Sequence, residues 1–145
     1  MITKKSITSV DIDELISLRW SPRAFDISKP VSREQMKSLA EAARWAPSCF
    51  NDQPYIFIFW NKDLDADHFA KAYDCVNEWN QKWVKNVPVL VAAFASNAFK
   101  HNKKENRWGG YDTGAACENL CLQAVSLGLV AHQMEIGRAS CRERV

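Results

Sequence analysis

The sequence predicts an α+β fold in which a small sheet is flanked by helices. Two continuous apolar runs, at 55–60 and 87–95, are rich in β-branched and aromatic residues and have the length of buried strands. Around them lie segments in which apolar residues recur at helical spacing. The chain of 145 residues has the size of one domain, so we expect a single core.

The first third of the chain is predicted to contain two helices joined by a linker at 26–31. Asp11 opens the first helix, which ends at Arg19. Its apolar stripe consists of Ile12, Leu15 and Ile16. Ser32 and Gln35 have the spacing of a capping box and predict the start of the second helix, which Pro47 closes.

The rest of the chain is predicted to contain two further helices and a third strand. The first helix covers about 65–84, and the polar segment 96–110 then forms a loop. Asp112 caps the next helix, which stops at 127–128, and residues 129–134 form the strand. The apolar side of the 65–84 helix consists of Phe69, Ala72, Tyr73, Val76, Trp79 and Trp83.

An arginine corner, Arg19-Trp20-Ser21-Pro22-Arg23, is the first candidate binding feature. Two guanidinium groups and a hydroxyl offer donors that suit phosphate geometry, and Pro22 disfavours helix at Ser21. The corner therefore suits an anionic ligand. The alternative is that the arginines only complement the dipole at the end of a helix.

The proline-bracketed loop 47–54 is the second candidate. Ser48, Asn51 and Gln53 can each donate and accept hydrogen bonds, which suits a ligand whose edge alternates acceptors and an N–H. A loop that only turns the chain can use the same residue types. A third polar segment, the basic cluster within 96–110, is interpreted as a solvated loop, with a mobile lid as the alternative.

Taken together, RWSPRAF at 19–25, APSCFNDQPY at 46–55 and DTGAACENLCLQAVSLGL at 112–129 resemble the FMN-dependent nitroreductase family. The resemblance covers about residues 10–134. It implies a mixed sheet flanked by helices and a homodimer with FMN at the subunit interface, in which the 112–127 helix lies in the dimer core.

The same resemblance implies roles for particular residues. Arg19, Ser21 and Arg23 hold the phosphate and ribityl end of FMN, and Trp20 contacts FMN through its backbone. Loop residues from the neighbouring subunit meet the flavin, and Gln53 supports their loop. Those residues are Pro47, Ser48 and Asn51.

The implied function is an FMN-dependent oxidoreductase that passes hydride from NAD(P)H through the flavin to nitroaromatic or quinone-type acceptors in a ping-pong cycle. No protein residue is predicted to be catalytic, because the flavin carries the chemistry. Two alternatives stay open: an inactive fragment that binds no flavin, and a specialised relative that uses the flavin for dehalogenation or ring fragmentation.

The end of the sequence departs from the family pattern. We expect residues 1–134 to form an incomplete FMN-binding domain and 135–145 to be a non-native tail, with the family's C-terminal part missing, because the tail has no apolar periodicity. The family's backbone donor to the flavin falls at Glu135 and Ile136, and its C-terminal basic residues have no counterpart.

Composition excludes several classes of function. The net charge of +2 favours no nucleic-acid partner, and no apolar run reaches the length of a membrane span. The five cysteines form no CxxC pair or metal-ligand spacing, so no metal site is predicted. An odd cysteine count without a disulfide framework suits a reducing compartment, and we expect a cytoplasmic protein.

Overall fold

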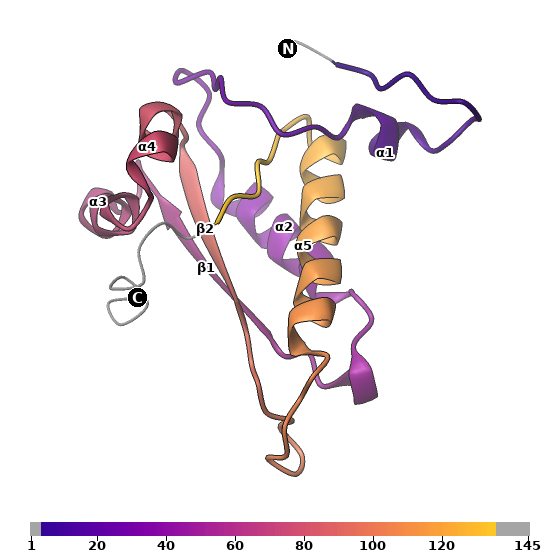
Figure 1. The fold of residues 1–145 in the computed structure, drawn as a ribbon. Helices are drawn as coiled ribbons and strands as arrows, with labels where there is room; N and C mark the ends of the chain where they lie inside the picture. The colour runs from indigo at the N-terminus through magenta and orange to yellow at the C-terminus, as the bar shows by residue number, and fades with distance from the viewer. Residues whose placement is uncertain (1–3, 136–145) are drawn as a thin grey trace.

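Two antiparallel strands form the centre of the fold, with helices on both sides of them (Figure 1). The computed structural model describes residues 4–135. In chain order the elements are α1 (Glu14–Leu18), α2 (Arg33–Arg44), the 3-10 helix η1 (Cys49–Asn51), β1 (Tyr55–Asn61), α3 (Ala66–Asp74), α4 (Glu78–Val84), β2 (Val89–Ala95) and α5 (Gly109–Ser126).

The register of the two strands divides the core into two parts. Tyr55 lies opposite Ala95 and Asn61 lies opposite Val89. Since successive side chains of a strand point to opposite faces, one face receives the aromatic side chains at 55, 57 and 59 of β1. These pack against a core that α2, the residues directly after it and α5 supply, made of Leu39, Ala43, Ala46, Ala116, Leu120 and Ala124.

The second part of the core includes α3 and α4. Phe69, Val76 and Trp83 pack there with Val84 and Leu90, and Trp60 of β1 lies against them. The structure confirms the α+β class and the capping box of α2, in which Ser32 accepts from the Gln35 backbone and Gln35 accepts from the Ser32 backbone. Over the described residues the sheet is antiparallel and has two strands.

The prediction of one helix over 65–84 is wrong, because the helix is interrupted between α3 and α4. Asn77 has an extended backbone, and its side chain accepts from the Asn80 amide at 2.8 Å, which caps a new helix. The Gln81 side chain donates to the carbonyls of Tyr73 and Val76, at 3.3 and 3.0 Å. These contacts satisfy the end of α3, and Trp79 turns out to solvent instead of lining the apolar side.

The predicted third strand at 129–134 is also wrong. This segment has no ladder partner among the described residues and is held by other contacts. The Leu129 amide donates to the Ala124 carbonyl at 2.8 Å, and the His132 and Gln133 side chains bond to groups outside the segment. An apolar run becomes a strand only where a neighbouring backbone offers hydrogen bonds.

Four further expectations need correction. The apolar stripe of the first helix is exposed, and that helix begins at Glu14 with Asp13 as its cap, not at Asp11. The last helix begins at Gly109, so Asp112 does not cap it. The two strands are not buried on both faces: residues 91, 93 and 95 of β2 are exposed. A two-stranded ribbon leaves part of each face open.

No helix within residues 4–135 is long and apolar enough to cross a membrane. Residues 136–145 lie outside the described part of the chain, and the predicted boundary between 1–134 and 135–145 stays a prediction.

Candidate functional site

The arginine corner follows directly from the end of α1. Arg19 is the C-terminal cap of that helix and has an extended backbone, as the following Ser-Pro pair favours. Its Nη1 donates to the Ser21 hydroxyl at 3.3 Å, and its Nε lies 3.9 Å from a carboxylate oxygen of Glu118 on α5. Ser21 and Arg23 are exposed. The corner therefore presents two guanidinium groups and a hydroxyl at the surface of the protein.

The buried Pro22 anchors this corner to the core. Its carbonyl lies 2.8 Å from Nδ1 of His132, and because a carbonyl can only accept, Nδ1 carries the proton of that bond. The His132 ring stacks on Trp83 with 4.5 Å between ring centroids, and Phe25 stacks on Trp83 at 5.9 Å. Trp83 and His132, both distant from the corner in sequence, thus hold the arginine corner in place.

The loop 47–54 is tied together by its own polar side chains. The Gln53 amide donates to the Ser48 hydroxyl at 3.0 Å, and the Gln53 side chain donates to the Asn51 carbonyl oxygen at 3.1 Å. The Cys49 amide donates to the buried Asp112 carboxylate of α5 at 3.0 Å. The carboxylate expected to cap α5 therefore fastens this loop to α5.

The backbone of the same loop is strained. Phe50, Asn51 and Gln53 have φ values of 55°, 54° and 48°, in the left-handed region that residues other than glycine rarely adopt. Such conformations cost roughly 1–3 kcal/mol each and persist only where the surroundings enforce them. Such conformations are frequent at functional sites, so they are consistent with a binding role for this loop.

The arginine corner and the loop 47–54 contact α5 at different positions along its axis. Glu118, which faces Arg19, lies six residues beyond Asp112, which holds the loop. At a rise of about 1.5 Å per residue these points are roughly 9 Å apart along the helix. Within residues 4–135 no hydrogen bond or ion pair joins Arg19, Ser21 or Arg23 to the loop, so one subunit does not bring the two halves of the predicted site into contact.

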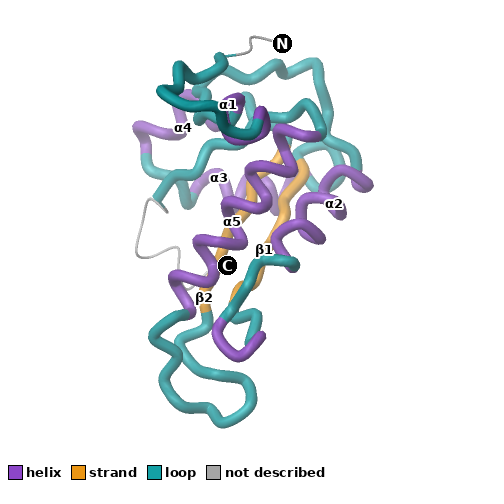
Figure 2. The backbone as a smooth tube through the Cα atoms, turned by 90° about the vertical axis from the view of Figure 1, so that its right-hand side faces the viewer, coloured by secondary structure: helices purple, strands orange, loops and turns teal. Residues whose placement is uncertain are grey.

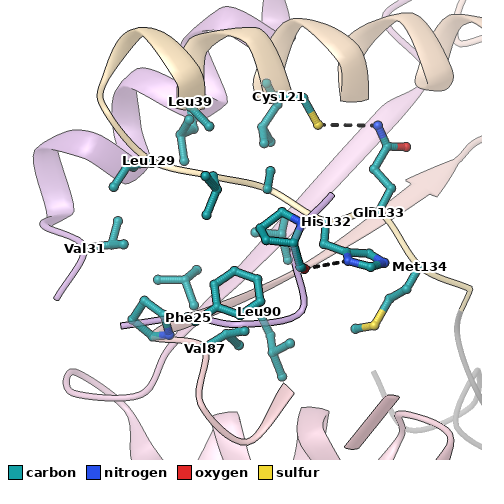
Figure 3. A pocket seen from close by; sticks show the side chains of 18 of the residues that line it. Phe25, Val31, Leu39, Val87, Leu90, Cys121, Leu129, His132, Gln133 and Met134 are labelled. Carbon is teal, nitrogen blue, oxygen red and sulfur yellow. Dashed lines mark hydrogen bonds between the residues drawn. The ribbon is translucent and has the colours of Figure 1, made fainter. Parts of the chain in front are cut away.

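A cavity of about 850 Å³ lies between the sheet and the segment 128–135 (Figure 3). Its lining is mainly apolar, and among the predicted site residues it includes only Trp20. The Gln133 side chain donates to the Cys121 sulfur at 3.4 Å along one wall. This cavity was not predicted, because it depends on where the chain after α5 lies.

Burial makes two cysteine thiols of α5 less reactive. Burial raises the pKa of the Cys117 and Cys121 thiols, which keeps them protonated and inert. Burial, followed by the charge of Asp112, also raises the pKa of Tyr55.

Sequence reasoning missed Asp52 and His132, and misjudged Asp112. An aspartate inside a polar loop resembles any turn residue, and a histidine in an apolar segment gives no sign of its partner. Their roles depend on contacts with residues far away in the sequence. Within residues 4–135 no group of three metal-ligating side chains occurs.

Residues 16–140 match the family model described as the nitroreductase family. The chain belongs to this family. A crystal structure of an oxidoreductase containing FMN is 34% identical and has a TM-score of 0.82, with 94% of this chain and 69% of that chain covered. A crystal structure of a protein from Desulfovibrio desulfuricans, described as a nitroreductase in complex with FMN, is 26% identical, with a TM-score of 0.69 and 84% and 66% covered.

Among curated proteins, the oxygen-insensitive NADPH nitroreductase of Helicobacter acinonychis is 33% identical over 79 residues. That match covers 54% of this chain and 35% of the relative. The matching stretch thus spans about a third of the length of this relative. The family match therefore supports the fold more strongly than the activity.

Proposed function

We propose that this chain is part of an FMN-dependent oxidoreductase that takes hydride from NAD(P)H. Family membership supports this, as do the related crystal structures that contain FMN and the NADPH nitroreductase among the relatives. When bound, FMN would supply the two-electron chemistry that carries the reducing equivalents to a nitroaromatic or quinone-type acceptor. The protein's own residues would bind and orient it.

The observation that carries the proposal is the arginine corner. Arg19, Ser21 and Arg23 form a donor set of the kind that a phosphate monoester requires, and Pro22 holds them on a buried anchor. The only ion pair of Arg19 within the described residues is the 3.9 Å contact with Glu118, which is partly exposed and weak. The guanidinium groups therefore remain available to an anionic ligand.

The separation of corner and loop supports a site shared between two subunits. Gly110, Gly114 and Glu118 form one row on the exposed side of α5, and Arg19 borders that row. A second subunit packed on the two glycines would bring its own loop 47–54 toward this corner. Pro47, Ser48 and Asn51 would then meet the flavin, with Gln53 supporting them, and Trp20 would offer its backbone.

A fragment that binds no flavin remains the second candidate function. The observation that favours it is the segment 129–134, which lacks the predicted strand pairing and leaves the exposed positions of β2 uncovered. The absorbance spectrum of the purified chain separates the two candidates, because a bound flavin is yellow. Specialised use of the flavin for dehalogenation would require substrate screening.

The experiment that tests the proposal replaces both Arg19 and Arg23 with alanine and measures FMN affinity by quenching of flavin fluorescence. Each charged hydrogen bond contributes roughly 1.5–3 kcal/mol, so we expect the dissociation constant to rise at least 100-fold. The control replaces Arg33 and Lys37, two exposed cations of α2, and removes the same net charge. Equal affinity in the double variant and wild type would refute the assignment.

A further inference from the structure

The loop between β2 and α5 reaches back to the strained loop 47–54 (Figure 2). The Lys100 amide donates to Oδ1 of Asp52 at 2.8 Å, and the Lys100 ammonium donates to the Gln53 carbonyl at 2.7 Å. The His101 ring nitrogen Nδ1 lies 3.8 Å from the same Asp52 oxygen. One residue of the later loop thus bonds to two neighbouring residues of the earlier one.

Aromatic contacts reinforce the same junction. Phe50 is 79% exposed, yet its ring packs edge-on against Phe99 at 5.8 Å and against His101 at 5.7 Å between centroids. These contacts join the loop 47–54 to the loop between β2 and α5. They lie directly beside the left-handed backbone of Phe50 and Asn51.

The buried side chain of Asp52 is unfavourable for folding stability. Its side chain is only 3% exposed, and Oδ2 is buried without a hydrogen-bond partner among the described residues. Burying an unpaired carboxylate oxygen is unfavourable, so a residue chosen for stability alone would leave no such atom. We therefore attribute the presence of Asp52 to the hydrogen bond that its Oδ1 accepts from the Lys100 amide.

We propose that Asp52 is a positioning residue that holds the loop 47–54 in its strained conformation by bonding to the backbone of Lys100. Ser48 and Asn51 are thereby presented in fixed positions to the flavin. This role rests on the proposed FMN site, but the clamp between the two loops exists in the protein without flavin and can be tested separately.

The test compares Asp52→Ala and Asp52→Asn in the full chain. Asparagine keeps an oxygen that can accept from Lys100, whereas alanine removes it. The control is Asp65→Ala, which removes another aspartate that accepts a backbone amide, that of His68 at 3.2 Å, at the start of α3. Two quantities are measured: hydrogen exchange of the amides at 49–53 and 100 without flavin, and the dissociation constant of FMN.

We expect exchange at 49–53 to accelerate at least tenfold in Asp52→Ala and at most threefold in Asp52→Asn and Asp65→Ala. FMN affinity should fall at least tenfold in Asp52→Ala and be largely restored in Asp52→Asn. Unchanged exchange in Asp52→Ala overturns the clamp. Faster exchange with unchanged FMN affinity overturns the positioning role.

Failure of the wild-type chain to bind FMN would refute the proposed function and, with it, the role toward flavin, while the exchange measurement would still decide the clamp. If Asp52→Ala does not fold, Lys100→Pro is the second variant. It removes the backbone N–H that donates to Asp52 and should accelerate exchange at 49–53 in the same way. Unaltered exchange in that variant would count against the clamp.

Discussion

Gly109 illustrates how a single residue fixes the approach of two segments. A Cβ atom at this position would lie 2.3 Å from the carbonyl oxygen of Ser96, which is backbone and cannot turn aside. The start of α5 therefore packs directly on the end of β2. The sequence shows two adjacent glycines, at 109 and 110, but it does not show which of them the packing requires.

We predict that Gly109→Ala destabilises the protein by about 1–3 kcal/mol, as overpacking does. Gly110→Ala is the matched control, because a Cβ at Gly110 meets nothing within 4 Å. The higher helix propensity of alanine should leave that variant neutral or stabilise it by up to about 1 kcal/mol. Urea unfolding of the two variants measures the difference, and equal stabilities would contradict the proposed contact.

At the scale of an element, α2 carries a local charge network at its end. The Arg44 side chain donates from Nε to Glu41 at 2.9 Å, and the Trp45 indole donates to Glu41 at 2.9 Å. These bonds, Arg44 first, lower the pKa of Glu41 from 4.5 to about 2. Because the pKa is depressed in the folded state, the stabilisation is present above about pH 4.5 and is lost as the pH falls through about 2.

We predict that Glu41→Gln weakens the dependence of stability on pH between about 4.5 and 2. The change should be small, because the pair is exposed to solvent and screened. Urea unfolding at pH 7, 4 and 3 measures it, with Glu34→Gln at the other end of α2 as the control. Parallel stability profiles for wild type and Glu41→Gln would show that the network does not contribute.

At the scale of the whole molecule, the exposed row of α5 predicts a dimer. A Cβ at Gly114 meets nothing within 4 Å in one subunit, and the aromatic rings of Trp108 and Tyr111 are exposed near the same end of the helix. Small residues allow a second helix to approach closely, and clustered exposed aromatics mark interaction surfaces. The family resemblance points to the same helix.

We predict that Gly114→Leu leaves the fold intact but abolishes the dimer. The added side chain has room on the surface of a single subunit, but it would block the close approach of a second subunit to α5. Sedimentation velocity should show a monomer at concentrations where the wild type is dimeric. Lys71→Leu adds the same side chain to exposed α3, on the other side of the sheet, and should not alter the assembly. A Gly114→Leu dimer of wild-type affinity would place the interface elsewhere.

Sequence patterns predicted those elements whose cause is local. The capping box at Ser32 and Gln35, the two apolar strands and the small residues of α5 all follow from neighbours within a few positions. The break at Asn77 could also have been recognised, since asparagine before Glu78 is a helix start signal. It was overlooked because the apolar periodicity continues across it.

For the candidate site, the sequence placed the arginine corner and the loop 47–54 but not what holds them. The anchors are His132 on Pro22, Asp112 on Cys49 and Lys100 on Asp52, each linking residues far apart in the chain. No local rule reports such contacts, because they depend on how the elements pack.

The sequence by itself determined the fold class, most helix and strand positions and membership of the family, because periodicity, caps and motifs are properties of short stretches. Only the tertiary structure decided that residues 129–134 form no strand, that Asp112 fastens a loop instead of capping a helix, and that Phe50, Asn51 and Gln53 are strained. The physical reason is that backbone pairing, burial and strain depend on partners distant in sequence, whose positions the folded chain alone supplies.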